Sequence, residues 1–257
     1  KPSSAASDVY KRQYDMVVQG MGGIMSVTGH PGTPPTRIGM SIGDIGSGLY
    51  ATIGVQAALF HRQLTGEATK VDIGMLDCQL ALLENAVMRY QVSGTAPGPL
   101  GARHPSITPF EAYKTKDGYI IISAGNDGLF AKLAEALENP GWAEDPDYSS
   151  NDNRNKHVEK LKIEMESVLT THTTSHWIEV LDKFGVPSGP INDIGQAATH
   201  PQTIARNMIV SVDDPITGPM KVAGNPIKIS GFEDPETREP APNLDQNREQ
   251  ILRELTD

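Results

Sequence analysis

One carboxylate in the chain stands in a setting that suits covalent chemistry. Asp44 lies between glycines in the stretch GDIGSG, directly before a run of apolar residues with helical spacing. Glycines leave backbone amides open around a carboxylate, and the positive end of a helix stabilises negative charge that develops beside it. An aspartate in this setting could attack an acyl group as a nucleophile, or it could be the helix N-cap, a common use of aspartate.

Other residues could act beside Asp44. Asp15, which lies 29 residues upstream, is either a second acid at the same site or an ordinary exposed or capping residue. Arg103 and His104 could meet an anionic substrate, or they could belong to a solvated turn. Because glycines keep backbone amides accessible, the nearest glycine on each side of Asp44 is a candidate for contact with a reacting acyl group; these are Gly43 and Gly46.

Other familiar catalytic sites are not supported by the sequence. The histidines are scattered, so spacing supports no serine-hydrolase triad, although GMSIG at 39–43 fits the G-x-S-x-G pattern. The stretch 20–23 lacks both the spacing of a dinucleotide fingerprint and the lysine of a P-loop. The single cysteine, Cys78, permits no disulfide within the chain and no CxxC metal site. We therefore expect neither nucleotide binding at 20–23 nor a bound metal.

Composition excludes some classes of partner. The 257 residues include 22 Lys and Arg against 32 Asp and Glu, a formal net charge of −10. Nucleic acid and anionic membranes need a basic face that neutralises phosphates, so neither is an expected partner. No apolar run approaches the roughly 18 residues of a membrane span, and the first residues lack a secretion signal. We expect a cytoplasmic protein.

The elements that must position Asp44 follow from apolar spacing. Helical spacing predicts a helix over about 45–64, which Gly66 would end. Alternation in KVDIGM predicts a strand over 70–75, and the apolar segment 75–92 predicts a buried helix. This part of the chain is therefore expected to be α/β.

A proline- and glycine-rich stretch, 94–109, is the candidate linker to a different kind of region. After it, FEAYKT and YIIISA flank Lys-Asp-Gly, which predicts a β-hairpin. Helices are predicted at about 127–138, 155–171 and 174–184, which makes this block a small α+β domain. From Met208 onward, short extended pieces alternate with turns.

Five ordered stretches resemble a known family. They are YDMVVQGMGGIMSVTG, GDIGSGLYA, VDIGMLD, HPSITPFEAYKTKDGYIIISAGND and GVPSGPIND, and in this order they are similar to the class III (CaiB/BaiF) CoA-transferases. The resemblance implies an α/β fold with a Rossmann-like large domain, a small α+β domain inserted by linkers, and two interlocked subunits in a homodimer. It also implies that the family's N-terminal part, with most of the CoA contacts, is missing here.

Domain boundaries follow from the patterns and the resemblance together. Residues 1–13 are expected to be a tail or a cloning scar, in which Lys11 or Arg12 would match a basic CoA contact only by chance. Residues 14–95 are the large-domain portion with the nucleophile, and 96–204 hold the linker and the small domain. Residues 205–257 are expected to return to the large domain.

The resemblance also implies a reaction. In that family, the aspartate at the position of Asp44 attacks an acyl-CoA thioester, forms a mixed anhydride and then an aspartyl-CoA thioester, and passes CoA to a carboxylic acid. Asp15 falls on an acidic position near the nucleophile that is commonly Glu. The implied substrates are an acyl-CoA, with succinyl-CoA as a candidate, and a small carboxylic acid. No permanently bound cofactor is implied.

The substrate and the alternatives are also read from this resemblance. The stretch GARHPS differs from the glycine-rich loop of formyl-CoA transferases, which favours a larger dicarboxylate over formyl or oxalyl groups. Arg37, Arg103 and His104 are the candidate cations for its distal carboxylate. Related racemases carry a catalytic histidine at the position of Tyr14, so an isomerase is the alternative that tyrosine disfavours. A catalytically silent fragment is the other alternative.

Overall fold

The computed structural model describes residues 14–256, so the tail predicted for 1–13, with Lys11 and Arg12, lies outside the described residues. The chain divides into two compact units, the first ending at Gly189 and the second beginning at Pro190. The segment boundaries predicted at 95/96 and 204/205 stay predictions.

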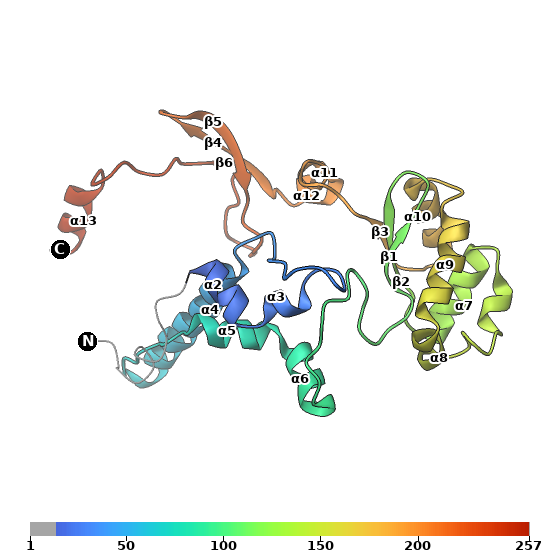
Figure 1. Cartoon of the computed structure of the whole chain (residues 1–257). Coiled ribbons are helices and arrows are strands. Elements are labelled where there is room, and N and C mark those ends of the chain that lie inside the picture. The colour runs from blue at the N-terminus through green and yellow to red at the C-terminus, as the bar shows by residue number, and fades with distance from the viewer. Residues whose placement is uncertain (1–13, 257) are drawn as a thin grey trace. The chain divides into compact units, whose positions relative to one another are not determined.

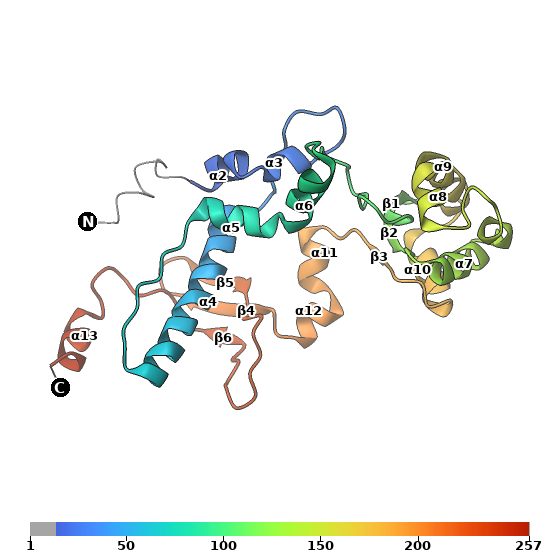
Figure 2. The same ribbon diagram turned by 90° about the horizontal axis from the view of Figure 1, so that it is seen from below.

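The first part of the first unit, residues 14–93, is helical (Figure 1), and we call it the helical region. Its helices are α2 (Asp15–Met21), α3 (Ile24–Val27), α4 (Ile42–Thr65), α5 (Met75–Leu82) and α6 (Glu84–Ser93). Figures 1 and 2 show α2 and α5 beside α4, and both helices contact it. The long helix predicted around Asp44 is confirmed, although it begins at Ile42. Gly66 ends it with φ of 79°, a left-handed conformation that glycine adopts readily.

Two predictions for the helical region are wrong. Residues 70–74 join no sheet in the described part of the chain. Alternation marks a segment that can pair, but a strand forms only where a neighbouring strand bonds its backbone. The buried helix predicted over 75–92 is divided at Leu83, whose backbone (φ −96°, ψ 25°) leaves the helical conformation and separates α5 from α6. It is also largely not buried, since only Cys78 and Gln79 of these two helices are buried.

The second part of the first unit begins at His104 and forms the predicted small α+β fold, which we call the α+β region. Its elements are β1 (Phe110–Lys114), β2 (Tyr119–Ser123), α7 (Asp127–Ala136), the 3-10 helix η1 (Pro140–Ala143), α8 (Asn151–Lys156), α9 (Val158–Leu169), α10 (Thr174–Lys183) and β3 (Ser188–Pro190). The predicted hairpin is confirmed: β1 and β2 pair antiparallel with Ala112 opposite Ile121, and β3 lies beside β2. Helices α7 to α10 lie on one side of the hairpin (Figures 1 and 2).

A continuous apolar core fills the space between this sheet and its helices. Its large members include Tyr113, Ile120, Phe130, Leu161 and Trp177, all buried. One charged side chain is buried beside them.

That side chain is Arg154 of α8. It donates to the carbonyl oxygens of Thr108 (2.7 Å) and Tyr148 (2.8 Å) and to Asp127 Oδ1 (2.8 Å). Because a buried guanidinium needs partners for its donors, these bonds let it fasten the end of the linker to α8 and α7.

The second unit is smaller. It contains α11 (Ile194–Thr199), α12 (Pro201–Ala205), β4 (Ile209–Asp214), β5 (Gly218–Ala223), β6 (Thr237–Arg238) and α13 (Arg248–Glu254). Strand β4 pairs antiparallel with β5 and parallel with β6, which confirms the extended pieces predicted after Met208. No helix among residues 14–256 has the length and apolar character needed to cross a bilayer.

Candidate active site

Asp44 lies in the first turn of α4, three residues after the N-cap, Ser41. The prediction that Asp44 could itself be the N-cap is therefore wrong. Its side chain is exposed, and its carboxylate has no hydrogen-bond or ion-pair partner among residues 14–256. A carboxylate in this position is accessible to a ligand and has no competing contact.

The backbone amides of this turn differ in what they bond. The N–H of Ile42 donates to Met40 O (2.9 Å), and the N–H of Gly43 donates to Asp15 Oδ1 (2.9 Å). The N–H of Asp44 has no acceptor in the described part of the chain. One donor of the positive helix end therefore remains available directly beside the exposed carboxylate.

Asp15 lies next to this turn because α2 crosses the start of α4. While Oδ1 accepts from Gly43, Oδ2 accepts from Nε2 of Gln19 (2.9 Å), one helical turn further along α2. Asp15 is half-buried. Both of its oxygens are thus engaged, unlike those of Asp44.

Gln19 is a functional candidate that sequence reasoning missed. It is buried, it bonds Asp15, and it also contacts the loop before α4 through Ile38 and Met40. The available signal was its spacing: a glutamine four residues after an aspartate in a helix shares its face. Its bonds to the loop could not be read from spacing.

Gly43 and Gly46 are buried where helices approach closely. A Cβ at Gly43 would lie 2.5 Å from Val18 Cγ1, and one at Gly46 would lie 2.8 Å from Leu82 Cδ1. Lack of a side chain at these two positions allows α2 and α5 to pack against the first turns of α4. A contact of either glycine with substrate stays a prediction.

The three candidate cations lie in different surroundings. Arg37 is exposed and its guanidinium bonds the carbonyls of Ile38 (3.2 Å) and Gly39 (3.1 Å), in the loop that leads to α4. Gln19 therefore connects the Arg37 loop with the Asp44 turn. Arg103 and His104 have no contact with Asp44 or Asp15 among the described residues.

Arg103 and His104 are held by the α+β region instead. Arg103 Nη1 lies 4.0 Å from Glu159 Oε1 of α9, and the His104 ring stacks on Phe110 with 5.3 Å between centroids. A nearby bond, from Gly101 N to Gly29 O (2.8 Å), ties the linker to the helical region. Their role toward a substrate stays a prediction.

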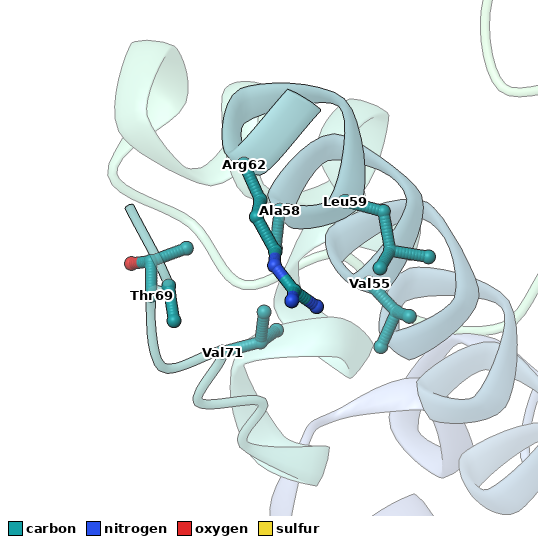
Figure 3. A pocket seen from close by; sticks show the side chains of 7 residues that line it. Val55, Ala58, Leu59, Arg62, Thr69 and Val71 are labelled. Carbon is teal, nitrogen blue, oxygen red and sulfur yellow. The ribbon is translucent and has the colours of Figure 1, made fainter. Parts of the chain in front are cut away.

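A pocket of about 350 Å³ lies elsewhere, between the C-terminal half of α4 and residues 68–71 (Figure 3). Arg62 extends over it among apolar side chains such as Val55, Leu59 and Val71. Val55 is eleven residues from Asp44, about 16 Å along a helix. This pocket is therefore not the surroundings of Asp44. Among residues 14–256, no group of three or more His, Cys, Asp or Glu could hold a metal ion.

The family model and two curated relatives that match this chain are all named as CoA-transferases. The model of "CoA-transferase family III" matches residues 4–248. An acetyl-CoA:oxalate CoA-transferase from Acetobacter aceti is 39% identical over 243 residues, and a succinate–glutarate CoA-transferase from Agrobacterium fabrum is 36% identical over 248 residues. Each alignment covers 94% of this chain but only 61% and 60% of those relatives. The chain thus spans about 60% of the length of the curated relatives it matches.

Solved structures give the same result. A CaiB/BaiF family protein from Brucella suis superimposes with a TM-score of 0.78 at 34% identity, over 98% of this chain and 65% of that one. A protein from Mycobacterium tuberculosis has a TM-score of 0.81 at 23% identity, over 94% of this chain and 63% of that one, which shows a shared fold. The expectation of a mixed α/β fold of this kind is confirmed.

Proposed function

The chain belongs to CoA-transferase family III, and on that premise we propose that it carries the nucleophile of an enzyme that moves CoA from an acyl-CoA to a dicarboxylic acid. The observation that carries this proposal is the contrast between two neighbouring carboxylates. Asp15 has both oxygens engaged, one by Gly43 N of α4 and the other by Gln19 of α2, whereas Asp44 is exposed and unpartnered within the described residues. Asp44 is therefore the carboxylate available to attack.

The first half of the reaction releases the donor acid. A carboxylate oxygen of Asp44 attacks the thioester carbonyl, the C–O bond forms, and the C–S bond breaks to release CoA thiolate. The product is a mixed anhydride. Thiolate then attacks the aspartyl carbonyl, which gives an aspartyl-CoA thioester and frees the donor carboxylate. Each step consumes one anion and produces one, so no net proton transfer is needed.

The second half repeats these steps with the acceptor. The acceptor carboxylate attacks the aspartyl-CoA thioester and expels thiolate, which then attacks the acceptor's acyl carbon and restores the Asp44 carboxylate. Negative charge develops on a carbonyl oxygen in every step. The unpaired N–H of Asp44 and the positive end of α4 are suited to stabilise it. Exclusion of water would protect both activated intermediates.

The substrate class is proposed from the relatives and from the cations. Two relatives are named for oxalate and for glutarate, both dicarboxylic acids. A second carboxylate on the acceptor needs a cation, and Arg37 is joined to the Asp44 turn through Gln19 and Asp15. We retain Arg103 and His104 as further candidates, and succinyl-CoA as the candidate donor.

We also propose that the protein is a homodimer in the cytoplasm, as the family resemblance implies. In that homodimer each subunit would have a complete Rossmann-like domain. Support comes from α4, which exposes several large apolar side chains, among them Leu49, Ile53 and Leu64. Light scattering of the protein expressed from its complete coding region tests the dimer. A monodisperse monomer at micromolar concentration would contradict it.

A panel assay tests the proposed activity. The protein expressed from its complete coding region is given succinyl-CoA with oxalate, glutarate or acetate as acceptor. We expect CoA transfer to at least one dicarboxylate and parallel double-reciprocal plots, which indicate that the donor acid leaves before the acceptor reacts while CoA stays covalently bound to the enzyme. Exchange of the α-proton with deuterated solvent and no need for an acceptor would support the isomerase alternative. The absence of both CoA transfer from succinyl-CoA to these acids and α-proton exchange would support the alternative of a catalytically silent chain.

A further inference from the structure

Two glutamines of the helical region are completely buried, yet their amides differ. Gln79 in α5 is 0% exposed, and neither Nε2 nor Oε1 has a hydrogen-bond partner in the described part of the chain. Gln19 in α2 is also 0% exposed, but its amide makes three hydrogen bonds. Because an apolar residue would fill the same space without needing partners, the bonds of Gln19 suggest a specific task.

The side chain of Gln19 bonds both the loop before α4 and Asp15 of its own helix. Its Oε1 accepts from Ile38 N (3.0 Å), and its Nε2 donates to Met40 O (3.3 Å) and to Asp15 Oδ2 (2.9 Å). Asp15 in turn accepts from Gly43 N (2.9 Å). A single buried amide thus fixes the loop and, through one carboxylate, the first turn of α4.

Each end of this connection lies one residue from a candidate functional side chain. Ile38 follows Arg37, whose guanidinium bonds Ile38 O and Gly39 O in the same loop. Gly43 precedes Asp44. Loss of the Gln19 bonds would therefore free the backbone that carries the cation relative to the backbone that carries the nucleophile.

We propose that Gln19 is a positioning residue that sets the separation between Arg37 and Asp44, and thereby the length of dicarboxylic acid that the enzyme accepts. This inference rests on the proposed function. One carboxylate of the acceptor must reach the aspartyl-CoA carbonyl at Asp44 while the other pairs with Arg37. A fixed separation favours one chain length, whereas a loose one accepts several.

The test replaces the amide by an apolar side chain of similar length. In Gln19→Met, kcat/KM is measured for straight-chain dicarboxylates from oxalate to adipate. Loss of a hydrogen bond to a charged group is worth about tenfold. We therefore expect the ratio of kcat/KM for the preferred acceptor to kcat/KM for the acid one carbon longer to fall about tenfold. Where that ratio is less than about ten in the wild type, it should fall to 1.

Gln79→Met is the matched control, because it removes an equally buried side-chain amide that has no hydrogen-bond partner among residues 14–256. Its length preference should equal that of the wild type. Should Gln19→Met fail to fold, Gln19→Glu replaces it: the side chain keeps its size and an acceptor for Ile38 N but loses both donors, and the same loss of preference is expected.

A double-variant cycle shows whether Gln19 acts through Arg37. In an Arg37→Ala background, Gln19→Met should no longer alter the length preference, because the cation it positions is gone. An unchanged preference in Gln19→Met, or an equal change with and without Arg37, would overturn the inference. Covalent trapping at Asp44 distinguishes failure of the proposed function from failure of the role of Gln19. Wild-type protein that transfers CoA without a trapped Asp44 contradicts the proposed function. Normal trapping, with the length preference of Gln19→Met unchanged, contradicts only the role of Gln19.

Discussion

The helical region and the α+β region are held together by different means. In the α+β region, sheet and helices enclose an apolar core, and Phe130 is 1% exposed. In the helical region, Phe60 of α4 is 62% exposed, and the contacts between helices depend on glycines and on the bonds of Asp15 and Gln19.

The two regions therefore differ in what a substitution should affect. Apolar packing is strong but tolerates small shifts of side chains, whereas hydrogen bonds from fixed amides specify direction and distance. The region with the candidate nucleophile is the one in which polar bonds fix the geometry. Substitutions should therefore affect stability most in the α+β region and reaction geometry most in the helical region.

The largest effect on stability is expected from a matched pair of phenylalanines. Phe130→Ala should cost about 3–5 kcal/mol, because it empties a packed site and removes the ring beneath the Arg154 guanidinium, 4.5 Å away. In the 257-residue chain by itself, Phe60→Ala should change stability by less than about 0.5 kcal/mol, since its ring is largely exposed there. Urea unfolding measures both. Equal costs would show that the two regions do not differ in this way.

A smaller effect is expected from glycines of α4. Gly43→Ala places a methyl 2.5 Å from Val18 Cγ1 and 3.1 Å from Asp15 Oδ1, which should cost about 1–3 kcal/mol by forcing α2 away. Gly48→Ala, in the same helix with no atom within 4 Å of the added methyl, should stabilise the helix by up to about 1 kcal/mol. Thermal unfolding compares the two, and a gain in both would refute close packing at Gly43.

Gln79→Met should stabilise the helical region by about 1 kcal/mol, because it removes a buried amide that has no hydrogen-bond partner among the described residues. The measurement is the urea midpoint at an unchanged m-value. A clear loss of stability would mean that the Gln79 amide is hydrogen-bonded in solution.

The smallest effect concerns pH and the α+β region. The N–H of Thr174 donates to Asp117 Oδ1 (2.8 Å), and this bond is the main reason why the pKa of Asp117 lies below its usual 3.8. A lowered folded pKa adds stability that is fully present above the unfolded pKa and is lost as pH falls through the folded value.

Asp117→Asn should accordingly lower the melting temperature slightly at pH 6, and the difference from wild type should shrink as the pH falls below about 4. Melting curves from pH 6 to pH 2 measure this difference. A gap that grows in acid would contradict the assigned role of the Thr174 bond.

Local patterns predicted several elements correctly. Helix α4, its end at Gly66 and the β1–β2 hairpin all follow from spacing and turn residues within a few positions of one another. The strand expected at 70–75 does not form in the described residues, because pairing depends on a neighbour that local alternation does not reveal.

The candidate site was predictable in part. Glycines around Asp44 pointed to the start of a helix, and that place is confirmed, although Ser41 and not Asp44 is the N-cap. The bond between Asp15 and Gly43 spans 28 residues, and the Gln19 bond to Ile38 spans 19. Such contacts depend on how α2 crosses α4, which no local pattern encodes.

Covalent trapping tests the role of Asp44 most directly. The protein expressed from its complete coding region is incubated with succinyl-CoA, treated with hydroxylamine and analysed by peptide mass spectrometry. Asp77, which is also exposed and third in its helix, is the internal control. We predict a hydroxamate at Asp44, none at Asp77 or Asp15, and loss of transfer by at least about a thousandfold in Asp44→Asn. Transfer of CoA with an unmodified Asp44, or full activity of Asp44→Asn, would contradict the assignment.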